Sequence, residues 1–331
     1  MIRVAVDVMG GDDAPVEIVA GAAAAASAEI QPVLYGSAGL DTGGMQLVQT
    51  ADVIGMVDPP VESVRAMPDS SLVAAVRSVA AGEADAVVSA GSTGAMLAAS
   101  LLHIRRLPGV RRPAIAVPIP ARRGPTVLID AGANADARPE DIVQFAHMGT
   151  VFAHEVLGVD DPLVRLLSIG EEDEKGNQLA IDAHALLRAS SLRFGGNTES
   201  RSLLEGDSDV IVTDGFTGNV ALKALEGTIR SVLDVLREEL SSSVRGRLGG
   251  LLIRSSARRV RSRLDPETYG GAYLLGLRGL VVIAHGSSSR TAIANAIRLA
   301  ARGVEHGVVE RVEERLGVLA SARSTTPTAE R

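Results

Sequence analysis

The chain has 331 residues, of which 46% are hydrophobic and 22% are charged, and it contains neither Cys nor Trp. A chain of this length and composition can bury a substantial core, and the absence of Cys excludes disulfides, thiol nucleophiles and cysteine zinc sites. The formal net charge of −7 argues against a nucleic-acid-binding protein, which usually carries a strongly basic face.

Short β-branched segments alternate along the chain with Ala- and Leu-rich segments. We expect strands at Ile2–Val8, Pro32–Tyr35, Ala86–Ser89, Ala114–Ile119, Thr126–Asp130, Leu163–Ile169, Val210–Thr213 and Gly279–Ala284. We expect helices at Pro15–Ala28, Ser71–Ala81, Gly94–Leu102, Pro139–Leu157, Leu179–Ser190, Thr217–Glu239 and Ser289–Val304. This alternation predicts an α/β fold with a doubly wound, mostly parallel sheet, in a single domain over residues 1–320.

The alternation is interrupted between residues 228 and 265, where we expect a protruding helical hairpin. Its second helix is rich in Arg. The Gly-containing stretch from Gly246 to Gly250 is expected to form the break between the first helix and the second. Residues 321–331 are rich in Ser, Thr, Ala and Pro and are predicted to be disordered. The first residues follow a strand pattern rather than that of a signal peptide, and no apolar stretch approaches the roughly 18 residues of a membrane-spanning helix. We therefore expect a cytoplasmic protein.

Loops rich in Gly, Asp, Asn and Ser follow most of the predicted strands. Ligands of doubly wound sheets bind at the carboxyl ends of the strands, and Gly lets backbone N–H groups approach a ligand closely. We therefore expect these turns to converge on one pocket that binds an anion, although each turn taken singly is also explained as an ordinary strand-to-helix turn. The candidate substrate-binding residues are Asp7, Gly10, Gly11, Ser89, Gly91, Ser92, Thr93, Gly94, Asp130, Asn134, Asn177, Asn197, Thr217 and Ser287.

One of these loops, from Ser89 to Gly94, ends a strand and opens a helix. Its free N–H groups and the helix dipole would form a seat for phosphate. The loop lacks the GK[ST] ending of a Walker A motif and the GxGxxG fingerprint, so a nucleotide is not indicated. The acidic residues of the loops are interpreted as helix caps in preference to magnesium ligands.

The rarest polar residues also gather in these loops. Only two of the 33 basic residues are Lys, and both lie in or just after Gly- and Asn-rich loops, where a compact ammonium group supplies what Arg cannot. Four of the five Asn residues lie in the loops, and their neutral amides suit either turns or the stabilisation of an oxyanion. A His that directly follows a predicted strand is either a general base or a structural residue. The candidate catalytic residues are Lys223, Asn219, His285, Asp214 and Lys175.

The order and spacing of the motifs resemble the phosphate acyltransferase family of bacterial phospholipid synthesis over nearly the whole chain. The motifs are DVMGGDDAP from Asp7, SAGSTGA from Ser89, LIDAGANAD from Leu128, QFAHMG from Gln144, IGEEDEKGN from Ile169, DGFTGNVALK from Asp214, YGGAYLLG from Tyr269 and IAHGSSS from Ile283. Four positions depart from the family pattern: Asp13 replaces a His, Ser92 replaces an Asn, and Ser200 and Ser202 interrupt a Gly-Arg-Asp sequence.

The resemblance implies a fold similar to phosphotransacetylase and the isocitrate dehydrogenase group, a homodimer, and no cofactor or metal. It implies that phosphate directly attacks the thioester of acyl-acyl carrier protein, and that the acyl-phosphate product goes to a downstream glycerol-3-phosphate acyltransferase for phosphatidic acid synthesis. Under this interpretation phosphate occupies the Ser89–Gly94 turn with either Lys beside it, Asn219 and Asn197 hold the oxyanion, and His285 or Asp214 handles the proton. The resemblance also implies peripheral association with the inner face of the membrane.

The Arg-rich hairpin allows three interpretations. It docks the acidic carrier protein, it meets anionic lipids, or it is a solvated helix face. The residues concerned are Leu251, Leu252, Arg254, Arg258 and Arg259. The rival functions are an NAD(P)-dependent decarboxylating dehydrogenase, for which the dinucleotide fingerprint is missing, and a non-catalytic scaffold that binds acyl carrier protein at the membrane.

Overall fold

The computed structural model describes residues 1–264 and 268–324. Its strands form one 11-stranded sheet with the order β3-β2-β1-β4-β11-β10-β5-β6-β9-β7-β8. Their bounds are β1 Ile2–Asp7, β2 Ile30–Gly36, β3 Leu47–Gln49, β4 Ala86–Ser89, β5 Ala114–Ile119, β6 Thr126–Ile129, β7 Val164–Leu167, β8 Phe194–Thr198, β9 Val210–Val212, β10 Ala272–Leu275 and β11 Leu280–Ile283.

The sheet consists of two parallel halves that run in opposite directions. In the first half β2, β1, β4 and β11 are parallel neighbours, and in the second half β6, β9, β7 and β8 are parallel neighbours. Between them β10 is antiparallel to both β11 and β5, and β5 is antiparallel to β6. The carboxyl ends of β1, β4 and β11 therefore lie at one edge, called the first edge, and those of β6, β7, β8 and β9 lie at the opposite or second edge.

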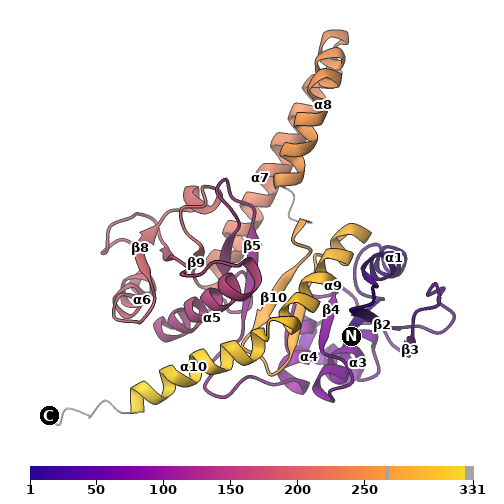
Figure 1. The fold of residues 1–331 in the computed structure, drawn as a ribbon, viewed down its shortest axis with the longest axis horizontal. Helices are drawn as coiled ribbons and strands as arrows, with labels where there is room; N and C mark the ends of the chain where they lie inside the picture. The colour runs from indigo at the N-terminus through magenta and orange to yellow at the C-terminus, as the bar shows by residue number, and fades with distance from the viewer. Residues whose placement is uncertain (265–267, 325–331) are drawn as a thin grey trace.

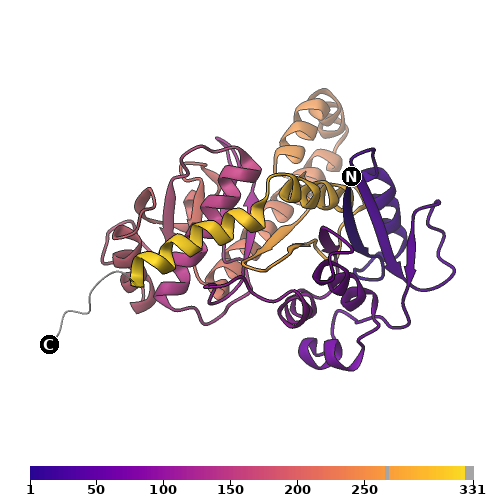
Figure 2. The ribbon, with the colours of Figure 1, turned by 60° about the horizontal axis from the view of Figure 1, so that its bottom comes forward.

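Helices cover both faces of the sheet, as the doubly wound prediction requires. One face carries α1 Val16–Ala25, α5 Pro139–Leu157, α6 Gln178–Arg188, α9 Arg290–Glu305 and α10 Val308–Ser324, and the other carries α2 Pro60–Ala66, α3 Ser71–Ala80, α4 Thr93–His103 and α7 Gly215–Ser242. Strand alternation divides the core in the same way, since Val4 and Val6 pack on the first face and Ala5 packs on the second. Figure 2 shows α10 lying along α5.

The helical hairpin projects away from the rest of the molecule (Figure 1). It consists of α7, 28 residues long, and α8 Val244–Leu264. The turn lies at Ser243, so the predicted break between Gly246 and Gly250 is wrong: these residues belong to α8. A Gly costs about 1 kcal/mol in a helix interior, which is too little to end a helix by itself.

Six elements were not predicted: β3, β8, β10, α2, α10 and the short 3-10 helix η1 Ser200–Leu204. Helix α10 continues to Ser324, four residues into the tail that was expected to be disordered, and the rest of that tail lies outside the described residues.

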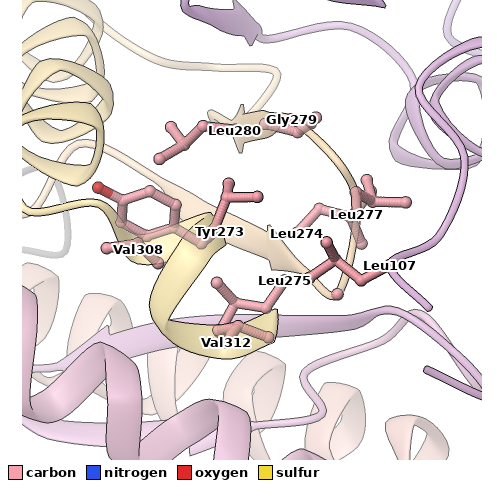
Figure 3. Close-up of a pocket in the computed structure, with 12 residues that line it drawn as sticks. Leu107, Tyr273, Leu274, Leu275, Leu277, Gly279, Leu280, Val308 and Val312 are labelled. Carbon is pink, nitrogen blue, oxygen red and sulfur yellow. The ribbon is translucent and has the colours of Figure 1, made fainter. Parts of the chain in front are cut away.

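A small gap in the packing lies between the β10–β11 hairpin and α10 (Figure 3). It measures about 10 Å³ and is lined by apolar residues that include Leu107, Leu280 and Val312. The hydroxyl of Tyr273 donates to the carbonyl oxygen of Leu299, so its polar atom is already satisfied. A volume of this size holds about one water molecule, and the gap is therefore no ligand site.

Candidate active site

The loops at the first edge pack tightly against one another. A Cβ atom on Gly10 would lie 2.8 Å from the nitrogen of Gly91, and one on Gly11 would lie 3.1 Å from the carbonyl oxygen of Gly286. The loops that follow β1, β4 and β11 thus form one cluster, which contains the predicted residues Asp7, Gly10, Gly11, Ser89, Gly91, Ser92, Thr93, Gly94, His285 and Ser287.

Most polar side chains of this cluster are used to hold the loops. Asp7 is buried and accepts from the Ser89 hydroxyl at 2.7 Å and from the backbone N–H of Met9, and burial raises the pKa of its carboxyl. Ser92 caps α4 by accepting from the N–H of Ala95. The exposed His285 bonds to Ser287 of its own turn at 2.9 Å. Thr93, at the start of α4, is exposed like His285 and Ser287.

At the second edge, Asp130 organises the loop that follows β6. Its buried carboxylate accepts from the N–H groups of Ile115, Gly132, Ala133 and Asn134 and from the Asn134 amide, while burial raises its pKa. With both oxygens engaged, Asp130 shapes the loop and has no free lone pair directed at a ligand.

The predicted asparagines differ in how far their amides are occupied. The Asn134 amide donates to Asp130 and to the carbonyl oxygen of Pro113. Asn177 caps α6. Asn197 is buried, faces His184 at 2.8 Å and donates to the Glu172 carbonyl oxygen at 2.7 Å. These three side chains therefore support the loops.

The start of α7 fits closely against the Asp130 loop. Asp214 caps the helix, since its oxygens accept from the N–H and the hydroxyl of Thr217 at 2.9 and 2.7 Å. A Cβ atom on Gly218 would lie 1.9 Å from the carbonyl oxygen of Asp130, and one on Gly215 would lie 2.7 Å from its Oδ2 atom. The two glycines of the DGFTGN motif thus allow the helix to approach the loop.

Asn219 and Lys223 lie one turn apart on α7 and have free polar groups. Neither side chain forms a hydrogen bond or an ion pair with the described part of the chain, and Asn219 is partly buried beside Gly132 while Lys223 is exposed. Residues four apart are neighbours on a helix surface, so the amide and the ammonium group face the same side of α7. They form a polar pair available to a ligand.

A groove of about 630 Å³ runs along the neighbouring side of α7. Its floor contains the buried residues Ile142, Leu166 and Ala183, and Phe216 and Val220 form its wall on α7. At about 100° per residue, Asn219 lies about 60° round the helix from Phe216, and Lys223 lies about 60° from Val220. The groove-lining residues of α7 extend round the other side of Phe216, through Thr217 and Ala221 to Leu225, so the polar pair lies outside the groove-lining face, next to its Phe216 edge.

The loop that carries Lys175 forms the opposite rim of this groove. Ser168, Ile169, Gly176 and Asn177 line it, and the loop is fixed because the Ser168 hydroxyl donates to the Lys175 carbonyl oxygen at 2.8 Å. The Lys175 side chain is exposed and forms no ion pair with the described residues. Lys175 thus directly precedes residues that line the groove, and neither lysine is itself among the lining residues.

The strand directions contradict the expectation that all these turns meet at one pocket. Asp130, Asn134, Lys175, Asn177, Asn197, Asp214, Thr217 and Asn219 belong to the second edge, whereas the Ser89–Gly94 turn and His285 belong to the first. The two groups of loops lie at opposite edges because the antiparallel pairs in the middle of the sheet reverse the direction of its second half. Lys223 lies on α7, about 12 Å beyond Gly215 at 1.5 Å per residue.

The apolar residues of the groove were not identified from the sequence. Phe216, Val220 and Ala224 recur every four residues within and after the DGFTGN motif, and this helical spacing marks one face of a helix. This spacing could have identified the groove-lining face of α7 from the sequence. Phe216 and Val220 on this face are 66% and 53% exposed.

The predicted contact residues of the hairpin lie on α8 and are exposed. Leu251 and Leu252 are 64% and 86% exposed, and Arg254, Arg258 and Arg259 also face solvent. No helix within residues 1–264 and 268–324 is long and apolar enough to cross a membrane. The same residues contain no cluster of three or more His, Asp or Glu side chains that could hold a metal ion.

The fold is that of the phosphotransacetylases. The chain is similar to a branched-chain phosphotransacylase from Enterococcus faecalis, with a TM-score of 0.59, 19% identity, and coverage of 92% of this chain and 100% of that one. It is also similar to the EutD phosphotransacetylase from Staphylococcus aureus, with a TM-score of 0.57, 17% identity, and coverage of 92% and 94%. At these identities the likeness concerns the fold, and it confirms the predicted fold class.

Sequence relatives are more specific. The model of the family described as "Fatty acid synthesis protein" matches residues 2–311. The phosphate acyltransferase of Thermus thermophilus is 48% identical over 326 residues, covering 96% of this chain and 99% of the relative. That of Heliobacterium modesticaldum is 43% identical over 327 residues, covering 95% and 98%. The chain therefore belongs to the phosphate acyltransferase family and is an acyltransferase, as its motifs predicted.

Proposed function

We propose that the protein transfers a fatty acyl group from acyl-acyl carrier protein to inorganic phosphate and releases acyl-phosphate. The observation that carries this proposal is the apolar groove along α7, bordered by the free amide of Asn219 and the free ammonium groups of Lys223 and Lys175. The two substrates together present an apolar chain, a carbonyl oxygen and an anion. The groove is apolar like the chain, the Asn219 amide can donate to the carbonyl oxygen, and an ammonium group can bind the anion.

The reaction requires one displacement at the thioester carbon. A phosphate oxygen forms a bond to this carbon, the carbonyl oxygen becomes an oxyanion, and the C–S bond breaks to release the pantetheine thiolate of the carrier protein. The thiolate then takes up a proton from solvent or from the monohydrogen phosphate that attacked. A chain without Cys carries this out without a thiol-based acyl-enzyme intermediate.

The groups on α7 are proposed to stabilise the charges of this displacement. Asn219 donates to the oxyanion, and the ammonium group of Lys223 neutralises phosphate, with Lys175 as the second candidate from the opposite rim. A fixed neutral donor beside a cation stabilises a developing charge without reorganisation. Asp214, Asp130 and Asn134 act indirectly in this scheme, since their hydrogen bonds hold the helix start and the loop beneath it.

The reaction itself is tested by incubating the protein with palmitoyl-carrier protein and following free thiol. Release of thiol that depends on phosphate, with palmitoyl-phosphate as product, is the expected result. Thiol release at the same rate without phosphate would indicate a thioesterase, and no release would leave the dehydrogenase or the scaffold as the better interpretation.

The role of the polar pair is tested by separate Lys223→Ala, Lys175→Ala and Asn219→Ala variants. Loss of one preorganised donor lowers kcat by about 10²–10³-fold, and we expect this for Asn219 and for the lysine that binds phosphate. Arg230→Ala is the matched control, because Arg230 is an exposed cation two turns further along α7. Near-normal turnover of Lys223→Ala would remove Lys223 from the site.

We also propose that the protein works as a homodimer in the cytoplasm, bound peripherally to the inner face of the membrane. Exposed apolar residues on both hairpin helices, such as Val232 and Val235 on α7 and Leu251 and Leu252 on α8, support this proposal. Membrane contact would deliver the acyl-phosphate to a glycerol-3-phosphate acyltransferase for phospholipid synthesis.

A further inference from the structure

The groove has the dimensions and the lining of a site for a single alkyl chain. It follows α7 from Asp214 to Thr228, which is about 21 Å at 1.5 Å per residue. Half of a hydrocarbon core of about 30 Å, or about 15 Å, is the length of one lipid acyl chain. The volume of about 630 Å³ also lies within the range of roughly 300–1,000 Å³ found for sites that enclose small ligands.

The distribution of polarity fits one end of a fatty acyl thioester. The floor and the α6 side are apolar, with Leu166, Leu179, Ala180 and Ala183. Seven polar residues also line the groove, most of them in the loops at the strand ends or in the first turn of α7: Ser168, Asn177, Ser200, Thr213, Asp214, Thr217 and, at the far end, Thr228. The Asn219–Lys223 side of α7 lies next to the groove-lining face. A chain buried among the apolar residues would hold its carbonyl carbon at the rim, beside the amide and the cations.

We infer that this groove binds the acyl chain of the substrate and that the length of the groove limits the chain length the protein accepts. This inference rests on the proposed function, because it names the part of the site that holds the acyl group. It adds the residues that select the substrate: Ala180 and Ala183 on α6, and Val220, Ala224 and Thr228 on α7.

The inference is tested with two pairs of substitutions that fill the groove or miss it. Ala180→Phe fills the α6 wall, and Ala185→Phe places the same side chain at an exposed position of the same helix outside the groove. Thr228→Phe blocks the far end on α7, and Val232→Phe lies one turn beyond the groove. None of the four residues belongs to the proposed catalytic groups.

Acyl-carrier proteins with chains from butyryl to stearoyl are compared for each variant. Each methylene that can no longer be buried lowers kcat/KM about fourfold, so we expect Ala180→Phe or Thr228→Phe to lose palmitoyl transfer by tenfold or more while butyryl transfer is unchanged. The two controls should retain the wild-type ratio of palmitoyl to butyryl transfer. Identical chain-length profiles for the groove variants and their controls would overturn the inference.

Two further measurements separate the remaining outcomes. Binding of cis-parinaric acid is measured by the fluorescence of the bound probe and requires no turnover. If the wild-type protein is inactive but binds the probe, and the variants with a filled groove do not bind it, the proposed function is refuted and the acyl-chain site is retained. Light scattering reports the oligomeric state. A groove variant that changes the oligomeric state and leaves the chain-length profile unaltered would assign the groove to a second copy of this chain, which would also overturn the inference.

Discussion

At the scale of single residues, Gly218 sets how closely α7 approaches the Asp130 loop. Because a Cβ atom at this position would lie 1.9 Å from a backbone oxygen of Asp130, Gly218→Ala must displace the helix start or the loop. We expect a loss of about 1–3 kcal/mol of unfolding free energy, in the range of overpacking, together with reduced activity. Thermal or chemical denaturation measures the change.

Gly227→Ala on the same helix is the matched control, since nothing lies within 4 Å of its Cβ position. Replacing an unobstructed helical Gly with Ala stabilises by roughly 1 kcal/mol, so the two substitutions should act in opposite directions. Equal stabilisation by both would show that α7 does not contact the loop as described.

The sequence identified candidate residue types but not which of their side chains remain free. Asn134, Asn177, Asn197 and Asn219 all occupy similar loops, and only contacts formed on folding separate them. The Asn134 amide, for example, is occupied by a carbonyl oxygen at Pro113, 21 positions away along the chain. Such partners leave no local pattern, and the free amide of Asn219 is visible only once the chain is folded.

At the scale of elements, Glu17 joins the first turn of α1 to the first residue of α9. Its carboxylate accepts from the backbone N–H of Arg290 at 2.8 Å and pairs with the Arg290 guanidinium. The hydrogen bonds from Arg290 lower the pKa of Glu17 from 4.5 to about 2. A carboxyl whose pKa is lowered by folding stabilises the fold above its unfolded pKa, and this contribution is lost as the pH falls from 4.5 toward 2.

Glu17→Gln should therefore lower the Tm at pH 7, and the difference from wild type should shrink as the pH falls below about 4.5. Tm values at pH 7, 5 and 3 measure this. Glu62→Gln on α2 serves as the control, since the exposed Glu62 forms no ion pair with the described residues. A Tm difference that stays constant over this pH range would show that the pair does not join the two helices.

The alternation of segments predicted most of these elements to within a few residues, but not the direction of the second half of the sheet. The signal was present: only six residues, 120–125, join β5 to β6, and parallel neighbours need a crossover of a dozen or more. Strand β10 was missed because its four residues lie inside a Gly-rich motif, YGGAYLLG. The short β5–β6 connection together with strand β10 would have predicted that the loops of the second half lie at the opposite edge from those of the first half.

At the scale of the whole molecule, the hairpin concentrates positive charge on an acidic protein. The net charge is −7, yet residues 240–264 contain seven Arg and no acidic residue. On α8, Leu248, Leu251 and Leu252 share one face by their spacing and are 59–86% exposed. Basic and apolar residues on one projecting element are the combination that binds an anionic membrane surface.

We expect the wild-type protein to float with vesicles that contain phosphatidylglycerol and to float much less with vesicles of phosphatidylcholine alone. Burying one Leu side chain is worth about 1.5–3 kcal/mol, so Leu251→Asp/Leu252→Asp should abolish flotation. Because the hairpin projects from the body (Figure 1), transfer from soluble butyryl-carrier protein should be unaffected. Val57→Asp, which removes an apolar side chain that is 96% exposed elsewhere on the molecule, is the control and should float normally.

The charged residues separate membrane binding from carrier-protein docking. Replacing Arg254, Arg258 and Arg259 by Gln removes about 1 kcal/mol of attraction to anionic lipid for each residue, and should weaken flotation most at low salt. If the Leu double variant floats normally and the Arg variant raises the KM for acyl-carrier protein, the hairpin docks the carrier protein. A loss of flotation in both variants, with an unchanged KM, assigns it to the membrane, because only a lipid surface uses the leucines and the arginines together.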